Sequence, residues 1–376
     1  MDASIPFWMY IVGFPLLLGP LVTLHELGHY LVGRWFGVQA VAFSVGFGKE
    51  LAGFTDRHGT RWKLSALPLG GYVQFKGDMN PASVPDRTRA AAPARDGTFQ
   101  NAPLWQRALI VFAGPATNVL VTLAIFAGFF MAIGKPVPAA PERQLTIAAF
   151  SAGSPAQKAG LKVGDRIVAI DGRTMGDFRD LQDAVMLYPG KQLAVSFERG
   201  GRTGTVPVMA ASVEQKDRFG NVSRIGLLGV RPAGVAFAFE RQNPVEATTM
   251  AVRYSVNVVR MMITGVGQIL SGERSVDELG GPIKIAKYSG EQLSLGPLAF
   301  INFVALISLN LAFINLLPIP GLDGGHLAFY AAEAVRRKPV GPRGLELAYR
   351  TGMALVLMLM LFVTFNDLAS LPIFGS

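Results

Sequence analysis

The sequence predicts a polytopic α-helical membrane protein with about four transmembrane helices and one inserted α+β domain. Two observations on composition support this fold class. Half of the 376 residues are hydrophobic and only 16% are charged, whereas a soluble domain is usually about a quarter charged. The mean hydropathy is +0.35. A third observation is that several segments exceed the roughly 18 apolar residues that mark a spanning helix.

Four segments are candidate spans. Residues 3–24, 108–134 and 292–322 contain no charged side chain, and residues 351–366 form a shorter fourth candidate. A cleaved signal peptide would begin with basic residues, but Asp2 is the first charge in this chain. We therefore expect the first segment to remain as a span. With their flanks, the four predicted transmembrane regions are 1–35, 104–134, 292–335 and 345–370.

The formal net charge is +9 and the pI is about 9.8. Such an excess of basic residues is typical of nucleic-acid binding or of the cytoplasmic loops of a membrane protein. No nucleic-acid-binding motif is present, so we predict no nucleic-acid partner. Basic residues are frequent in 34–103 and 336–343, and none occurs in the first six residues or after Asn366. The positive-inside rule then places both loops in the cytoplasm and both termini outside.

Residues 36–103 are predicted to form a cytoplasmic-side, membrane-associated β-hairpin loop and a linker. The stretches VAFSVGFG and WKLSALPLGGYVQF alternate like strands around the turn-like FTDRHGTR, and they are too short and polar to span a bilayer. His58 lies in this turn, and we interpret it as a surface histidine. Residues 77–97 are rich in Pro, Ala and Arg, which predicts a low-order linker.

Residues 137–233 are predicted to form one domain outside the membrane. Within it, KQLAVSFERGGRTGTVPVMA predicts a hairpin with Gly200 and Gly201 at its tip. The stretch SPAQKAGLKVGDRIVAIDG closely resembles a PDZ domain, so we expect a PDZ-like domain. A PDZ sheet has an edge to which a peptide can add as a strand. A spacer that only blocks access to the membrane is the alternative, and both remain open.

Residues 240–291 are predicted to contain a helix that lies on the outer membrane interface. Apolar residues recur at helical spacing from residue 245 to 270, but Arg253 and Arg260 interrupt them. Two charges are costly inside a bilayer, so an interfacial helix is the better interpretation.

The first predicted span contains the stretch HELGH, with His25, Glu26 and His29. Two histidines four residues apart lie on one face of a helix and can bind one metal ion, usually zinc. Glu26 is one position further round and can act as the general base toward the attacking water. Histidines buried against polar partners are the structural alternative, but ionisable groups deep in a membrane are costly and are usually functional.

A catalytic zinc site needs a third protein ligand and one open position. The chain has no cysteine, so a thiolate ligand is excluded. The candidates are Asp323 and His326 in NLLPIPGLDGGH, which follows an uncharged span. The Pro-Ile-Pro break before Asp323 interrupts a helix and allows a side chain to turn inward. Spacing alone does not choose between the two residues.

Several stretches resemble the site-2 protease family of intramembrane zinc metalloproteases, and in particular the bacterial regulator-of-sigma-E proteases within it. Besides HELGH and NLLPIPGLDGG, the similar stretches are FSVGFGKEL, LPLGGYVQF, FAGPATNVL, GGPIKIA and SLNLAFINLLPIPGLDGGHL. The likeness runs nearly from end to end. One departure is that the enterobacterial form has two tandem PDZ domains, whereas this chain has room for one.

The resemblance implies roles for individual residues. It implies that one Zn²⁺ is held by His25, His29 and Asp323, and that Glu26 is the catalytic base. His326 has no ligand role in that family. The residues implied to bind substrate are Asn315, which holds the substrate backbone, and Gly70, Gly71 and Tyr72 in the strand-like LPLGGYVQF. Gly114, Pro115 and Asn118 match a family motif in the second span, for which helix packing is at least as good an explanation as catalysis.

The resemblance also implies a location and partners. It places the chain in the bacterial inner membrane, so that the outside is the periplasm. The implied substrates are single-span membrane proteins, such as an anti-sigma factor already trimmed by an upstream periplasmic protease, or remnant signal peptides. Two other functions fit parts of the sequence: a non-catalytic PDZ-bearing membrane scaffold, and a metal transporter. The intact His-Glu-His set argues against the first, and the lack of inverted repeats argues against the second.

Overall fold

The structure is a computed structural model that describes residues 5–77, 97–138, 144–216, 222–232, 237–273, 276, 280–338 and 341–369. Most of the linker predicted at 77–97 therefore lies outside the described residues. The chain forms two compact units. The first comprises residues 1–126, 251–255 and 279–376, and the second comprises residues 127–250 and 256–278.

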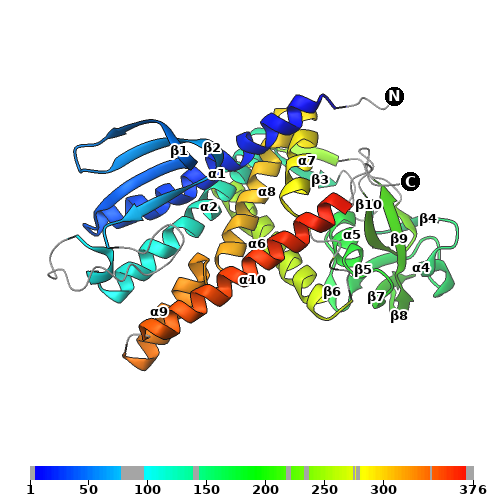
Figure 1. Cartoon of the computed structure of the whole chain (residues 1–376). Coiled ribbons are helices and arrows are strands. Elements are labelled where there is room, and N and C mark those ends of the chain that lie inside the picture. Colours follow the sequence, from blue (N-terminus) through cyan, green and yellow to red (C-terminus); the bar gives the residue numbers. More distant parts are fainter. Residues whose placement is uncertain are drawn as a thin grey trace. The chain divides into compact units, whose positions relative to one another are not determined.

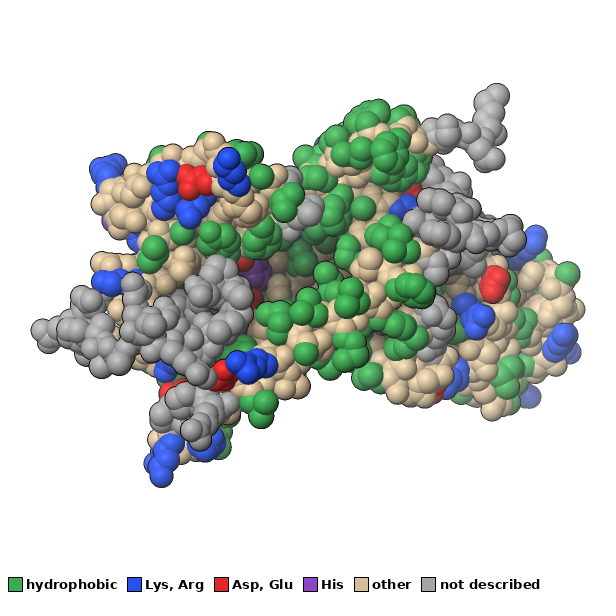
Figure 2. Space-filling model, viewed as in Figure 1, with side chains coloured by type: hydrophobic (Ala, Val, Ile, Leu, Met, Phe, Trp, Pro, Cys, Tyr) green, Lys and Arg blue, Asp and Glu red, His purple; other side chains and the backbone are tan. Residues whose placement is uncertain are grey.

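Four described helices are long and apolar enough to cross a membrane, as the composition predicts. They are α1 (Phe7–Trp35), α2 (Leu104–Ala132), α8 (Pro297–Asn315) and most of α10 (Pro342–Ala369). Hydrophobic side chains cover much of the visible helical surface (Figure 2). Three further helices are α6 (Pro244–Leu270), α7 (Pro282–Ser294) and α9 (Asp323–Arg336).

The third apolar segment differs from the single stretch predicted at 292–322. Helix α7 ends at Ser294, and Gly296 has φ 103°, a left-handed value that favours glycine and separates α7 from α8. Helix α8 then ends at Asn315, before the Pro-Ile-Pro stretch. The uncharged run therefore contains two helix ends, which hydropathy alone does not reveal.

The hairpin of the first unit folds back on itself. Strand β1 (Ala40–Thr55) pairs antiparallel with β2 (Arg61–Phe75), and residues 61–64 pair with both 42–45 and 52–55. Residues 71–75 pair with the other side of 40–45, so they form one edge of the sheet. Both strands lie beside α1 in Figure 1.

Aromatic side chains hold this sheet against the helices. Phe43 and Phe75 are buried in one cluster with Tyr30 of α1 and Ile110 of α2. Burying such side chains contributes about 1.5–3 kcal/mol each relative to exposing them. The packing therefore places the edge at 71–75 next to the histidines of α1.

The second unit contains the whole segment predicted to be PDZ-like, residues 137–233. Strands β7 (Gln192–Arg199) and β8 (Arg202–Met209) form the hairpin predicted from the sequence, and Gly200 and Gly201 have φ 55° and 76° at its tip. Helix α5 (Phe178–Met186) contributes Leu181 and Val185 to the core of this unit. The remaining elements among the described residues are η1 (Phe99–Asn101), β3 (Lys135–Pro138), β4 (Ile147–Phe150), α4 (Pro155–Lys158), β5 (Arg166–Ile170), β6 (Arg173–Thr174), β9 (Ala211–Lys216), β10 (Val222–Leu227), β11 (Val230–Pro232) and β12 (Phe237–Glu240).

Candidate active site

Helix α1 presents both histidines of HELGH to the interior of the first unit. His25 and His29 are one helical turn apart, and each is 7% exposed. Their Nε2 atoms are 3.1 Å apart. Nδ1 of His29 lies 2.8 Å from the carbonyl oxygen of Ile110 in α2. Since a carbonyl only accepts hydrogen bonds, His29 carries its proton on Nδ1, and its Nε2 lone pair faces the site.

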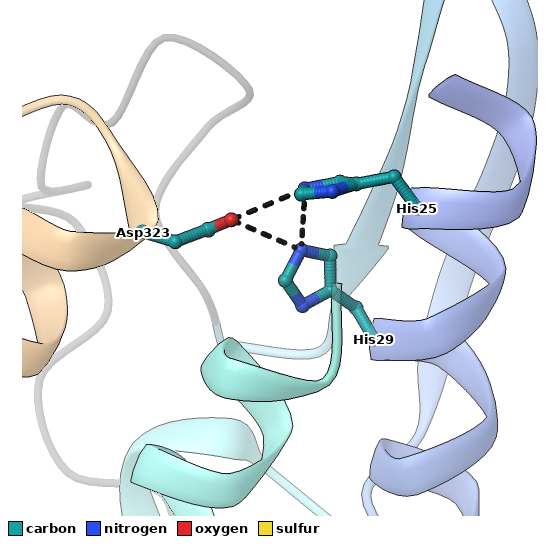
Figure 3. A group of neighbouring side chains, drawn as sticks. All are labelled: His25, His29 and Asp323. Carbon is teal, nitrogen blue, oxygen red and sulfur yellow. Dashed lines mark hydrogen bonds and ion pairs between the residues drawn. The ribbon is translucent and has the colours of Figure 1, made fainter. Parts of the chain in front are cut away.

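Asp323 reaches the same point from a distant part of the chain. It is the first residue of α9 and follows the irregular segment after α8. Its Oδ2 atom is 3.1 Å from Nε2 of His25 and 3.6 Å from Nε2 of His29, as Figure 3 shows. Glycine is required at Gly324 and Gly325, because a Cβ there would lie 2.2 Å and 2.3 Å from the carbonyl oxygens of the preceding turn.

These three side chains have the donor set and the spacing that a zinc ion requires. Oδ2 of Asp323 is buried and makes no hydrogen bond to any described residue. Four-coordinate zinc with bonds of about 2.0–2.1 Å separates its ligand atoms by about 3.3–3.4 Å. The three observed separations, 3.1, 3.1 and 3.6 Å, lie close to that value. The site therefore fits one ion held by two imidazoles and one carboxylate.

Glu26 is anchored by the sheet edge. Its Oε2 atom accepts a hydrogen bond of 3.0 Å from the backbone N–H of Val73. The same edge lies beside Glu26 at Gly71, where a Cβ would be in van der Waals contact with Cγ of Glu26 at 3.8 Å. A backbone donor of β2 thus orients the carboxylate beside the two histidines.

A cavity of about 330 Å³ opens onto these groups. Besides the three candidate ligands and Glu26, its lining includes Gly71, Tyr72 and Asn315 among the predicted substrate-binding residues. Gly70 does not line it: this residue has φ 155°, and a Cβ there would lie 2.4 Å from the ring of Phe47. Histidine side chains are visible inside a hollow on the face drawn in Figure 2.

His326, the other candidate for third ligand, has a different partner. It lines the cavity, but its Nδ1 atom lies 2.7 Å from the hydroxyl oxygen of Tyr349 in α10. The group of three that the structure brings together contains Asp323 and not His326. His58 lies in the exposed turn between β1 and β2.

Sequence reasoning missed two functional groups because both belong to the backbone. These are the carbonyl of Ile110, which holds His29, and the N–H of Val73, which holds Glu26. Asn118 was singled out by its motif without an assigned role, and its side chain lies 3.3 Å from Nδ1 of His25. A carboxamide within a charge-free span is a usable signal, because a polar group buried there needs a partner.

Comparison with known proteins identifies the family of the chain. The profile of peptidase family M50 matches residues 13–359. A protein of Agrobacterium fabrum named as a zinc metalloprotease is 42% identical over 367 residues, which cover 96% of each chain. One of Rhizobium meliloti with the same kind of name is 44% identical, covering 94% of this chain and 95% of its own. The metalloprotease MmpA of Caulobacter vibrioides is 35% identical, with 98% of each chain covered.

Among solved structures, the PDZ domain of an SdrC-like protein from Listeria monocytogenes matches 24% of this chain and 87% of its own, with 16% identity and a TM-score of 0.19. A likeness of that size assigns no fold, so the PDZ character of the second unit stays a prediction. The match to the family profile and the identity to the zinc metalloproteases both extend over nearly the whole chain. The chain therefore belongs to peptidase family M50, the site-2 protease family of zinc metalloproteases.

Proposed function

We propose that this chain hydrolyses a peptide bond within or near the transmembrane segment of single-span membrane proteins, with His25, His29 and Asp323 as zinc ligands and Glu26 as general base. Family membership makes the chain a multi-pass intramembrane zinc metalloprotease. The proposal adds the residues and the substrates. The observation that carries it is the convergence of three ligand atoms, from two distant segments, within 4.8 Å of one another.

Glu26 is placed for proton transfer. Bound zinc would supply the Lewis acid that polarises the scissile carbonyl and acidifies water at the site. The hydrogen bond from Val73 occupies Oε2 of Glu26, which leaves Oε1 to take the proton from the attacking water. Protonated Glu26 then delivers that proton to the leaving amide nitrogen, so one carboxylate serves both steps.

The sheet edge is the proposed binding surface for the substrate backbone. In a membrane helix the carbonyls are tied up in hydrogen bonds, so the substrate must unwind before it can react. The N–H of Val73 points to α1 and not to β1, and Gly71 lies two residues earlier, on the same edge. An extended substrate can add there as a strand. Gly71 and Tyr72 line its path, and Gly70, with φ 155°, directly precedes them in the strand.

Asn315 is proposed to bind backbone groups that unwinding exposes. It ends α8 and lines the same cavity as Glu26 and Asp323. Its carboxamide offers both a donor and an acceptor. A segment held between this residue and the edge of β2 would expose its peptide bond to the site.

The second unit is proposed to select substrates outside the membrane. A cavity of about 600 Å³ lies along α5 and strands β10 and β11, lined by Leu181, Val185 and Leu227 among others. A groove of this size, beside strand backbone, supports peptide binding over a purely steric spacer. We propose that it admits substrates already trimmed by an upstream periplasmic protease, with an anti-sigma factor as the expected class and remnant signal peptides as a second one.

The test is Glu26→Gln in the full chain. We expect bound zinc to be retained and cleavage of a model single-span substrate to fall by about 10²–10⁴-fold, the range of general acid–base catalysis. Mass spectrometry of membranes should show single-span proteins accumulating in the variant, which would identify the substrates. Cleavage at the wild-type rate would refute the role of Glu26. Metal uptake that requires His25 but not Glu26 would instead support the transporter alternative.

The proposed orientation has a direct test, because the chain has no cysteine. Both termini and the second unit are expected in the periplasm of the bacterial inner membrane, and the β1–β2 turn in the cytoplasm. Val163 is 62% exposed in the second unit, and His58 is exposed in the turn. In spheroplasts, a membrane-impermeant maleimide should modify Val163→Cys at once and His58→Cys only after permeabilisation. The reverse pattern would invert the topology.

A further inference from the structure

One face of α2 lies directly behind the two imidazoles. Ile110, Gly114 and Asn118 are spaced by four residues, so they form a single row on the helix. The Ile110 carbonyl faces Nδ1 of His29, and the Asn118 carboxamide faces Nδ1 of His25. Gly114 lies between them, level with the two Nε2 atoms.

Gly114 makes room for the metal-facing nitrogens. A Cβ at this position would lie 2.2 Å from Nε2 of His29 and 2.7 Å from Nε2 of His25. Both separations are shorter than Cβ contacts in real structures. The two Nε2 atoms are also the ones that face Oδ2 of Asp323. Any side chain at Gly114 would therefore displace the imidazoles from the arrangement that fits zinc.

Asn118 controls which nitrogen of His25 carries the proton. Its Nδ2 atom lies 3.3 Å from Nδ1 of His25, and its Oδ1 atom is buried with no hydrogen-bond partner among the described residues. With Nδ2 facing the ring, Nδ1 accepts and the proton sits on Nε2. With the carboxamide turned by half a rotation, Nδ1–H donates to Oδ1, and Nε2 keeps a lone pair for a cation. Only the second arrangement leaves the Nε2 lone pair of His25 free to bind metal.

The backbone of Asn118 is held from the opposite side. Its carbonyl oxygen accepts hydrogen bonds from Ser308 of α8 at 2.9 Å and from Thr122 at 3.0 Å. Asn118, Thr122 and Ser308 are each 0% exposed. The packing of α2 against α8 thus sets the position of the carboxamide.

We propose that this row of α2 is the positioning surface of the zinc site: Asn118 accepts the Nδ1 proton of His25, the Ile110 carbonyl accepts that of His29, and Gly114 leaves room for both Nε2 atoms. Asn118 acts through His25, so it is a positioning residue. The inference rests on the proposed function, in which both histidines are ligands. Partners of this kind are worth about 10–100-fold in metal affinity.

The experiment measures the zinc affinity of the purified full chain by competition with a chelator, and the visible spectrum of the cobalt-loaded protein. Asn118→Leu should bind zinc about 10–100-fold more weakly than wild type. Asn118→Asp, which can only accept a hydrogen bond, should restore the affinity and the cobalt spectrum. If the aspartate variant binds zinc as weakly as the leucine variant, the assigned acceptor role is wrong.

Two matched controls separate positioning from packing. Thr117→Val removes a side-chain hydrogen bond to the Ala113 carbonyl of the same helix without touching an imidazole or Asn118, and it should keep the zinc affinity. Gly114→Ala should abolish zinc binding, whereas Gly128→Ala on the same helix should not, because a Cβ at Gly128 meets no described atom within 4 Å. Zinc affinities that fall equally in both members of either pair would overturn the inference.

His25→Ala distinguishes the two levels of the proposal. If it keeps wild-type zinc affinity, the ligand assignment in the proposed function fails. If it loses zinc while Asn118→Leu binds as wild type, only the role of Asn118 fails. A leucine variant that does not fold leaves the aspartate and Gly114 variants to decide, since each makes its own prediction for zinc binding.

Discussion

Two aspartates, one in each unit, show how a structural carboxylate differs from one proposed as a zinc ligand. Asp165 in the second unit is 1% exposed, and the guanidinium of Arg199 bonds both of its oxygens at 2.6 and 2.7 Å. The N–H of Lys162 adds a third bond at 2.7 Å. Oδ2 of Asp323 in the first unit is also buried, yet no described donor bonds it and two imidazole nitrogens face it.

The difference lies in whether the charge is already compensated. The hydrogen bonds from Arg199 hold the pKa of Asp165 below its usual range despite its burial. This carboxylate is therefore ionised, and both of its oxygens already have hydrogen-bond donors. A buried carboxylate without donors is costly unless a cation compensates it. The unpaired oxygen of Asp323 is therefore consistent with its proposed role as a zinc ligand, whereas Asp165 has no such unpaired oxygen.

The largest expected effect comes from exchanging each aspartate for alanine. Asp323→Ala should weaken zinc binding by more than roughly 100-fold, the upper end of the loss in metal affinity when a hydrogen-bond partner of a ligand is removed. The stability of the second unit should change little. Asp165→Ala should keep zinc and lower the free energy of unfolding of the second unit by about 1–3 kcal/mol, the cost of lost hydrogen bonds to a buried charge. Elemental analysis and denaturant unfolding measure the two outcomes. If His326→Ala loses zinc while Asp323→Ala keeps it, the ligand choice is reversed.

A smaller effect is expected at the sheet edge. Val73→Pro removes the N–H that orients Glu26, whereas Val73→Ala keeps it. We expect kcat for a model substrate to fall about tenfold or more in the proline variant, a part of the 10²–10⁴ available to general acid–base catalysis. The alanine variant should stay near wild type, and zinc content should be unchanged in both. Equal activities in the two variants would show that this backbone donor does not position Glu26.

The smallest effect concerns the turn of the hairpin. The indole N–H of Trp62, with the backbone N–H groups of Thr60 and His58 and the hydroxyl of Tyr30, lowers the pKa of Asp56 to about 2. Because the folded pKa lies below the ordinary value of about 3.9, this contribution to stability is complete above pH 4 and is lost as the pH falls toward 2. Tryptophan fluorescence emission should change as the pH falls from about 4 to about 2, because protonation of Asp56 weakens its hydrogen bond with Trp62. Asp56→Asn should remove the transition, and a persisting transition would assign it to another group.

The sequence by itself determined the features that depend on local spacing. The i, i+4 relation of His25 and His29, the apolar lengths of the helices and the Gly200–Gly201 hairpin all involve residues close in the chain. Such patterns are set by helix and strand periodicity, which is the same in any fold. This is why the donor types of the site, and the membrane class of the protein, could be predicted from the order of residues alone.

Tertiary structure decided which distant groups complete the site. Spacing alone did not choose between Asp323 and His326. In the fold, Asp323 lies next to His25, whereas His326 lies next to the hydroxyl of Tyr349. The fold also supplied the carbonyl of Ile110, a group that every residue type has, and the N–H of Val73, which every type except proline has. Backbone groups carry no sequence signature, and contacts between separate segments depend on packing, so only the folded chain could place them.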